Sequence, residues 1–227
     1  KAKELEEQGK KIIHLEVGEP DFKPPKEVKT ALAEVYDEGY GKYGSPKGIM
    51  ELRTAIGIGI EGHDEGIEDS IMICPGARFA VYLAITTLLN PGDEIIVIEP
   101  SWPAYKDCAL NAGIKVRTIK TTLETKWEPS IEQINNAINQ NTKMIILNSP
   151  NNPTGKVLPK KLLDDIIQTA KDHDLYVLSD EIYSEYANND WQSVLIYNYE
   201  KSIVTKSFSK SHAMTGYRIG YTIAEKS

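Results

Sequence analysis

The stretch MIILNSPNNPTG, residues 144–155, joins an unbroken apolar run to a loop rich in asparagine and proline. A short apolar run that ends in turn residues is typical of a strand buried on both faces, as in parallel sheets. Similar β-rich runs occur along the rest of the chain, at 71–74, 94–98, 114–119, 175–179, 202–206 and 218–223. We therefore expect a sheet of seven strands.

Helical patterns separate several of these runs. Residues 76–89 carry apolar positions at helical spacing and stop at Asn90-Pro91-Gly92, a strong helix breaker. Residues 159–173 begin with a proline and place their apolar side chains on one face. The alternation predicts an α/β fold: a mostly parallel seven-stranded sheet with helices on both faces.

The N-terminal region does not show this alternation of strands and helices. An extended segment, HLEVGEPDF (14–22), precedes a helix near 25–38. The loop GYGKYGSPKG (39–48), rich in glycine and tyrosine, then leads into another helix. We interpret this region as an arm and a loop and not as a second complete domain.

Composition excludes several classes of protein. The 227 residues carry a net charge of −7, which argues against a nucleic-acid partner. No run of apolar residues is long enough to predict a membrane span. The two cysteines form no C-x-x-C pair, so we expect neither a zinc site nor a disulfide framework, and the cytoplasm is the favoured location.

Polar residues gather where the predicted strands end. Ligands of open α/β sheets bind beyond the carboxyl ends of the strands. The segments at those ends are Pro75–Arg78, Pro100–Trp102, Asn148–Gly155, Asp180–Tyr183 and Ser207–Lys210. They bring a helix N-terminus, an aromatic ring, an amide, a carboxylate and a lysine to one edge of the sheet.

Each of these residues alone has an ordinary structural explanation. Gly76 suits a turn, Trp102 core packing and Asp180 a helix cap, and Lys210 suits the surface. Together they fit pyridoxal phosphate, which needs a lysine for its aldehyde, a carboxylate at its ring nitrogen, an aromatic over its face and donors for its phosphate. Arg218, eight residues after Lys210, is a cation that could lower the pKa of that lysine.

Two competing motifs are weaker. GIGIEG (57–62) matches the G-x-G-x-x-G dinucleotide pattern, yet it follows a helical pattern instead of a strand. Ser207–Lys210 matches the S-x-x-K motif of penicillin-binding proteins, yet the chain lacks the K-T-G motif that this family also needs. Neither motif predicts the function as well as the lysine and carboxylate together.

The chain resembles the class I/II aminotransferases, the fold type I enzymes that depend on pyridoxal phosphate, and in particular their aspartate aminotransferase-like members. The motifs that carry the resemblance are LEVGEPDF (15–22), KYGSPKGIMELRTAI (42–56), PGARFAVYLAI (75–85), EPSWPAY (99–105), NSPNNPTG (148–155), SDEIY (179–183) and SFSKSHAMTGYRIGY (207–221). The resemblance implies a large cofactor-binding domain over 46–227. Residues 1–45 would be an arm with part of a small domain and a dimer-contact loop.

The resemblance implies catalytic roles for three residues. Lys210 would bond to the cofactor's aldehyde carbon and later shuttle the proton between the substrate Cα and the cofactor C4′. Asp180 would pair with the protonated ring nitrogen. Tyr183, together with Asn152, would hydrogen-bond the 3-oxygen of the ring, and Trp102 would stack on the ring face.

The resemblance also implies which residues bind the phosphate and the substrate. The predicted phosphate contacts are Gly76, Ala77, Arg78, Ser207, Arg218 and, from the partner of a homodimer, Tyr43. The predicted substrate contacts are Gly18, Trp102 and Asn152. Arg78 departs from the family pattern, in which a small residue or lysine is common. The C-terminal small domain and its carboxylate-binding arginine are missing from this sequence.

The implied reaction is amino transfer by a ping-pong mechanism. An aspartate- or aromatic-type amino acid would give its amino group to a 2-oxo acid such as 2-oxoglutarate. Two alternatives stay open: a pyridoxal-phosphate-dependent C–S β-lyase or synthase on the same fold, and a non-catalytic domain that only binds the cofactor.

Overall fold

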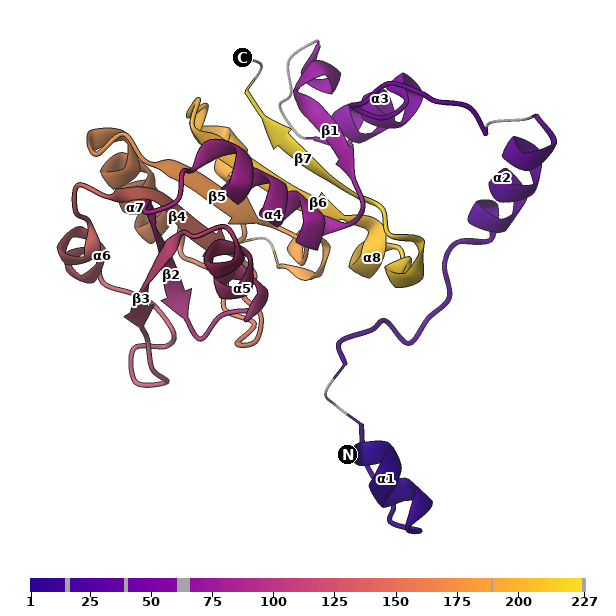
Figure 1. The fold of residues 1–227 in the computed structure, drawn as a ribbon, viewed down its shortest axis with the longest axis horizontal. Helices are drawn as coiled ribbons and strands as arrows, with labels where there is room; N and C mark the ends of the chain where they lie inside the picture. Colours follow the sequence, from indigo (N-terminus) through magenta and orange to yellow (C-terminus); the bar gives the residue numbers. More distant parts are fainter. Residues whose placement is uncertain (15–16, 39–40, 61–65, 189, 226–227) are drawn as a thin grey trace.

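The structure is a computed structural model that describes residues 1–14, 17–38, 41–60, 66–188 and 190–225. A layered α/β domain carries an N-terminal arm that extends away from it (Figure 1). The domain is built on one seven-stranded sheet, as predicted. Its strands are β1 (Ile71–Cys74), β2 (Glu94–Glu99), β3 (Lys115–Lys120), β4 (Thr142–Asn148), β5 (Tyr176–Asp180), β6 (Ser202–Ser207) and β7 (Gly220–Ala224).

The spatial order of the strands is β1-β7-β6-β5-β4-β2-β3. Every pairing is parallel except those of β7, which is antiparallel to both β1 and β6. β1 and β6 therefore run in the same direction, and their last residues, Cys74 and Ser207, both lie opposite Gly220. The carboxyl ends of β1, β2, β4, β5 and β6 thus share one edge, and the start of β7 lies among them.

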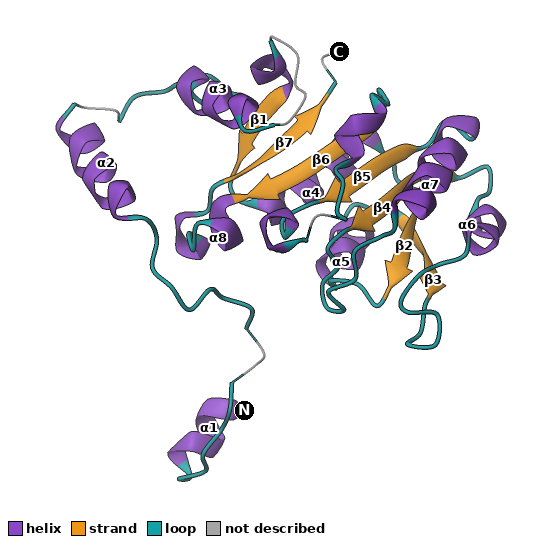
Figure 2. Ribbon diagram, turned by 180° about the vertical axis from the view of Figure 1, so that it is seen from behind, coloured by secondary structure: helices purple, strands orange, loops and turns teal. Residues whose placement is uncertain are grey.

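Helices cover both faces of the sheet (Figures 1 and 2). On one face α4 (Ala77–Leu88) and α5 (Ala104–Asn111) pack in one apolar cluster, and on the other α6 (Ile131–Ala137) and α7 (Lys160–Asp172) pack in a second. Successive strand residues alternate between the clusters. Met144 and Ile146 face α4 and α5, whereas Ile145 faces α6 and α7. This alternation explains why β4 is apolar on both of its faces.

The remaining helical elements are short. They are α8 (Phe208–Ser211) and the 3-10 turns η1 (Ile67–Ser70), η2 (Ser184–Tyr186), η3 (Val194–Tyr197) and η4 (Thr215–Tyr217). Neither α5 nor α6 was singled out by sequence periodicity, because each spans only about two turns. The N-terminus of α6 is fixed by a capping box, in which Ser130 and Gln133 bond each other's backbone amides.

Two strands begin two residues away from the sequence-based prediction, and one of them is β4, which begins at Thr142 instead of 144. We expected the last strand to begin at residue 218, but β7 begins at Gly220. Arg218 has a left-handed backbone, with φ of 57°, which ends the preceding turn and cannot continue an extended strand.

The N-terminal arm contains α1 (Ala2–Glu7) and α2 (Lys26–Asp37), and neither helix buries a residue. By contrast α3 (Met50–Ile58) packs on β1 and η1 through the buried Ile56 and Arg53. Residues 15 and 16 of LEVGEPDF, 39 and 40 of the loop GYGKYGSPKG, and 61 and 62 of GIGIEG lie outside the described residues. The boundary at residue 45 stays a prediction.

Among the residues that the structure describes, no helix combines the length and the apolar character that crossing a membrane requires.

Candidate active site

A cavity of about 860 Å³ opens at the edge where the strands end. Its walls come from five strand ends and from residues 17–19 of the arm, so segments distant in sequence meet there. Nine of the predicted site residues line it: Gly18, Ala77, Arg78, Trp102, Asn152, Asp180, Tyr183, Lys210 and Arg218. The convergence predicted from the sequence is therefore present in the fold.

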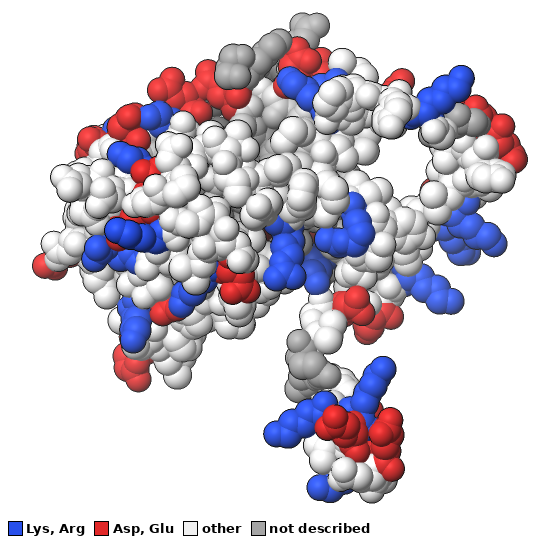
Figure 3. Space-filling model, in the orientation of Figure 1, with Lys and Arg blue, Asp and Glu red and all other residues white. Residues whose placement is uncertain are grey.

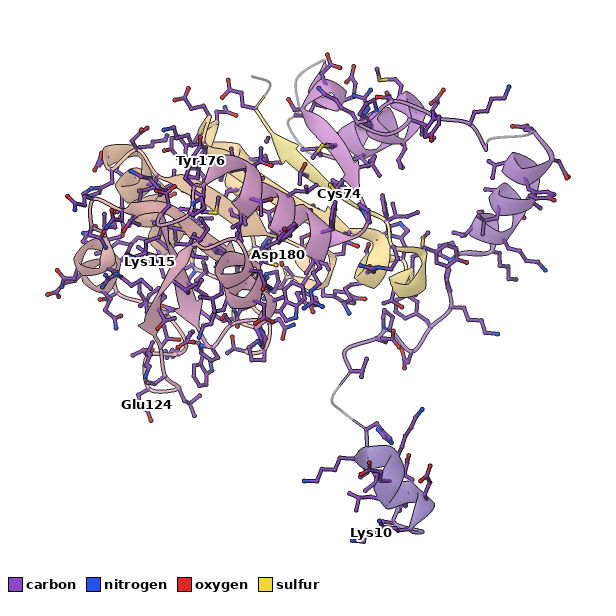
Figure 4. All side chains as sticks on the ribbon, in the orientation of Figure 1. Lys10, Cys74, Lys115, Glu124, Tyr176 and Asp180 are labelled. Atoms are coloured by element: carbon purple, nitrogen blue, oxygen red, sulfur yellow. The ribbon has the colours of Figure 1, made fainter. Side chains whose placement is uncertain are left out.

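Asp180, the last residue of β5, is the buried acid of the site (Figure 4). Only 2% of it is exposed. The Tyr105 hydroxyl donates a hydrogen bond of 2.6 Å to Oδ2, and the Ile182 amide donates one of 3.3 Å to Oδ1. Burial raises the pKa of Asp180 to about 6, and these hydrogen bonds oppose that rise. The site thus holds a carboxylate that still ionises at neutral pH.

Two asparagines connect the loop after β4 to Asp180. The Asn148 side chain donates a 2.9 Å hydrogen bond to the Asp180 carbonyl and accepts one of 2.7 Å from the Asn152 amide. The Asn152 side chain in turn donates to the Tyr183 hydroxyl at 3.4 Å. Burial, and then the Asp180 charge, raise the pKa of Tyr183, which keeps its hydroxyl protonated. Asn152 and Tyr183 are therefore held beside the carboxylate.

Lys210 enters the same cavity from α8, the short helix after β6. Ser207 caps this helix by accepting a hydrogen bond of 3.1 Å from the Ser209 amide. The Lys210 ammonium donates to the carbonyl of Gly18 in the arm. Burial lowers the pKa of Lys210, Arg218 lowers it further, and Glu19 opposes them. A half-buried lysine with a lowered pKa has the properties of an amine that gains and loses a proton.

The N-terminus of α4 and Arg218 form a positively polarised corner of the cavity. Gly76 precedes the helix with φ of 85°, and a Cβ there would lie 2.2 Å from Nη2 of Arg218. Arg218 donates to the carbonyls of Thr215 at 2.8 Å and Pro75 at 3.3 Å, which hold its guanidinium against the helix. Free helix amides, the helix dipole and a cation together favour an anion.

Aromatic rings form the wall beside Asp180. Trp102 meets Tyr105 edge to face, with ring centroids 5.5 Å apart and planes at 87°. The Arg78 guanidinium lies 5.5 Å from the centre of the Trp102 ring, a cation–π distance. Lys and Arg side chains gather between α5 and α8 on this face of the molecule (Figure 3). The cavity can therefore take a flat, negatively charged molecule.

Three predicted site residues do not line the cavity. Gly76 is the residue that precedes Ala77 in the sequence, and only Ala77 lines the cavity. Tyr43 is fully exposed in the loop before α3. Ser207 is buried, and its hydroxyl donates to the Ile219 carbonyl at 2.8 Å, whereas Ser209 lines the cavity instead. The contacts predicted for these three residues with a phosphate stay predictions.

Sequence reasoning missed two residues that hold the site together. Tyr105 and Asn148 both line the cavity and both bond Asp180. Tyr105 lies within the quoted motif EPSWPAY and Asn148 opens NSPNNPTG, but neither spacing indicates a contact with Asp180. These contacts depend on strand order, which the local sequence does not specify.

Comparison with known proteins identifies similar chains. A family model described as aminotransferase class I and II matches residues 10–227. The aspartate aminotransferase of Thermotoga maritima is 36% identical, with 100% of this chain and 61% of the relative covered. The aspartate/prephenate aminotransferase of Thermus thermophilus is also 36% identical, with 100% and 60% covered.

Solved structures agree with these relatives. The crystal structure of the Thermotoga maritima aspartate aminotransferase matches with a TM-score of 0.92 at 35% identity, covering 99% of this chain and 61% of that one. An alanine aminotransferase from Pyrococcus furiosus matches with a TM-score of 0.91 at 36% identity, covering 98% and 58%. The chain spans about three fifths of the length of the curated relatives that it matches.

Proposed function

Because this chain belongs to the class I and II aminotransferase family, whose enzymes depend on pyridoxal phosphate, we propose that it forms the cofactor-binding part of an aminotransferase. The proposed reaction moves an amino group from an aspartate- or aromatic-type amino acid to a 2-oxo acid such as 2-oxoglutarate, by a ping-pong sequence. One observation carries the proposal: a lysine with a lowered pKa and a buried carboxylate face the same cavity.

The residues present fit pyridoxal phosphate. The amides at the start of α4 and the Arg218 guanidinium would hold the phosphate, in a corner where a Cβ at Gly76 would collide with that guanidinium. The Asp180 carboxylate would meet the ring nitrogen, and the Lys210 amine is the only lysine amine among the described residues that line the cavity. Trp102 would cover one face of the ring.

Bound in this cavity, pyridoxal phosphate supplies an electron sink for the negative charge left on the substrate Cα. Asp180 holds a proton at the ring nitrogen, since its buried charge lacks water to stabilise it. Lys210 moves the proton on and off Cα, because its lowered pKa leaves more of the amine neutral. Asn152 and Tyr183 orient the 3-oxygen, and Trp102 keeps water from the ring face.

The proposal includes a homodimer. Tyr43 would reach the phosphate site of the partner, and its complete exposure leaves it free to do so. The arm that precedes it exposes further apolar side chains, including Leu32, Val35 and Tyr36. Sedimentation at increasing protein concentration tests the dimer, and a Tyr43→Ala variant that binds cofactor as the parent chain does would contradict the role of Tyr43.

With Cys74 and Cys108 both unpaired, we place the protein in the cytoplasm.

Covalent capture of the cofactor tests the proposed function directly. The chain is incubated with pyridoxal phosphate, reduced with borohydride, and the mass of the protein and of its peptides is measured. We expect the added mass on Lys210 and none in Lys210→Ala. Lys206→Ala is the matched control, because Lys206 lies four residues away over Trp191, outside the cavity. No capture by the parent chain, or equal capture by Lys210→Ala, would contradict the proposal.

Product analysis separates amino transfer from the lyase alternative. An aminotransferase converts aspartate to its 2-oxo acid only in proportion to the cofactor or acceptor supplied. Ammonia and pyruvate released from cysteine-type substrates, without an acceptor, would favour the β-lyase instead.

A further inference from the structure

Tyr105 lies in the first turn of α5, next to Asp180 and Trp102, the residues that would face the cofactor ring. The reaction as proposed gives it no role. It is 2% exposed, and its hydroxyl donates the shortest hydrogen bond that Asp180 receives from the described residues, at 2.6 Å to Oδ2. Its ring meets the indole of Trp102 edge to face. One side chain therefore contacts both the carboxylate and the aromatic ring that face the cofactor position.

We propose that Tyr105 is a positioning residue that fixes the Asp180 carboxylate toward the cofactor ring nitrogen and supports the Trp102 indole beside it. The inference rests on the proposed function, because it concerns the same cavity. Tyr105 and the Ile182 amide each occupy one oxygen of Asp180. A carboxylate can accept about four hydrogen bonds, so both oxygens keep acceptor positions for the cavity.

A hydroxyl suits this position better than a cation would. An arginine or lysine bonded to Asp180 would neutralise the charge that the ring nitrogen needs, whereas a tyrosine donates a hydrogen bond and leaves the charge in place. None of the ion pairs between described residues involves Asp180. Burial, and then the Asp180 charge, raise the pKa of Tyr105 well above its usual value, so the hydroxyl stays a donor.

The other charged and titratable groups of the cavity come from different elements. Tyr183 follows β5, Lys210 lies on α8, Arg218 precedes β7, Arg78 lies on α4 and Glu19 on the arm. The Thr205 side chain, from the neighbouring strand β6, also lowers the pKa of Asp180. Among these titratable groups, Tyr105 is the one that α5 places beside Asp180.

The chain contains a matched control for the hydroxyl. Tyr197 in η3 also donates a 2.6 Å hydrogen bond to an aspartate, Asp164 of α7, but outside the cavity. Tyr105→Phe keeps the ring against Trp102 and removes only the hydroxyl, and Tyr197→Phe does the same at the distant pair. A difference between the two variants in cofactor binding therefore reports on position and not on the loss of a tyrosine hydroxyl in general.

The first readout is the dissociation constant for pyridoxal phosphate, measured from absorbance at pH 7. Tyr105→Phe removes a donor that orients the Asp180 carboxylate and favours its charged form, which the ring nitrogen needs, so we expect it to weaken binding by on the order of tenfold. We expect Tyr197→Phe to change it less than about twofold. An unchanged constant in Tyr105→Phe would overturn the inference, whereas a parent chain that binds no cofactor would overturn the proposed function instead.

The second readout needs no cofactor. In the chain labelled with ¹³C at aspartate carboxyls, we expect the Asp180 resonance to titrate at higher pH in Tyr105→Phe than in the parent chain, because one stabilising donor is gone. Within the parent chain, the ¹³Cζ resonance of Tyr105 should shift as Asp180 ionises, a measurement independent of any variant. An Asp180 titration that leaves Tyr105 unchanged would overturn the inference.

A double-mutant cycle separates positioning from packing. In the Asp180→Asn background, Tyr105→Phe should weaken cofactor binding less than about twofold, because the charge on which its hydroxyl acts is absent. An equal loss in both backgrounds would mean that Tyr105 acts through packing alone, and it would overturn the role of the hydrogen bond.

Discussion

Helices α7 and α2 show the same amphipathic pattern in sequence but have different surroundings in the fold. α7 buries Leu163, Ile166 and Ile167 against the sheet. α2 buries no residue, and its Leu32 is 50% exposed. The pattern predicts a helix with an apolar face, but it does not say whether the chain itself supplies the partner for that face. Most helical stability comes from such packing, so the two regions should respond differently to the same change.

The largest contrast is expected from apolar truncation. Ile166→Ala should lower the free energy of unfolding by about 2–5 kcal/mol, because it leaves a cavity between α7 and the sheet. Leu32→Ala should change it by less than about 0.5 kcal/mol. Urea unfolding followed by circular dichroism measures both. A large loss in Leu32→Ala would show that the arm is packed in solution, against the domain or against a second copy.

The second largest effect is the pH dependence of the free energy of unfolding, which should amount to a few kcal/mol at most. We expect it for the sheet domain and not for the arm. Burial raises the pKa of Glu181 to about 7, from a usual value of 4.5. The folded state then binds the proton more tightly than the unfolded state, so this carboxyl costs stability as pH rises from about 4.5 to about 7. Glu181→Gln should therefore gain stability over the parent chain across this window and keep that gain above it.

Thermal unfolding of the cofactor-free chain between pH 4 and pH 8 gives the comparison. The Glu181 carboxylate accepts hydrogen bonds from Ser179, Ser193 and Val194, which a glutamine oxygen can also accept. A constant difference between the two proteins over the whole range would contradict the raised pKa. A substitution of an exposed acid in α2, such as Glu34→Gln, is the control from the arm.

Glycine substitution gives a smaller contrast at the site itself. A Cβ on Gly220 would lie 2.7 Å from the Ala77 amide nitrogen, where β7 passes the start of α4. Gly220→Ala should therefore cost about 1–3 kcal/mol, since backbone must move. Gly44→Ala in the arm loop meets nothing within 4 Å and should be close to neutral. Equal melting temperatures for the two variants would show that the α4 corner is not tightly packed.

The smallest effect concerns helix caps. Ser130→Ala removes the capping box of α6 and should cost about 1 kcal/mol of unfolding free energy. α2 starts after Pro25 without any side-chain cap, so Pro25→Ala should have less effect on the unfolding transition of the domain. Chemical denaturation resolves a difference of this size. A larger loss from Pro25→Ala would mean that α2 contributes to the cooperative unit.

Much of the fold followed from local sequence. The β-rich runs predicted all seven strands, and the central ones are apolar because residues buried between two helical layers must be apolar on both faces. The rule that ligands bind at the carboxyl ends of strands brought Lys210, Asp180, Asn152 and Trp102 into one predicted site, and all four line the cavity. These predictions needed only the local pattern of each segment.

The tertiary structure decided what depends on contacts between distant segments. The sequence by itself determined the strands, the longer helices, the sheet edge and the chemical groups available there, because neighbouring residues carry the burial pattern and the turn chemistry. Only the fold placed Tyr105 on Asp180, Gly18 on Lys210 and Arg218 against Gly76. Only the fold shows that β7 is antiparallel to both of its neighbours and that α2 buries no residue. Strand order and hydrogen bonds across many residues are set by the packing of the whole domain, which no local pattern encodes.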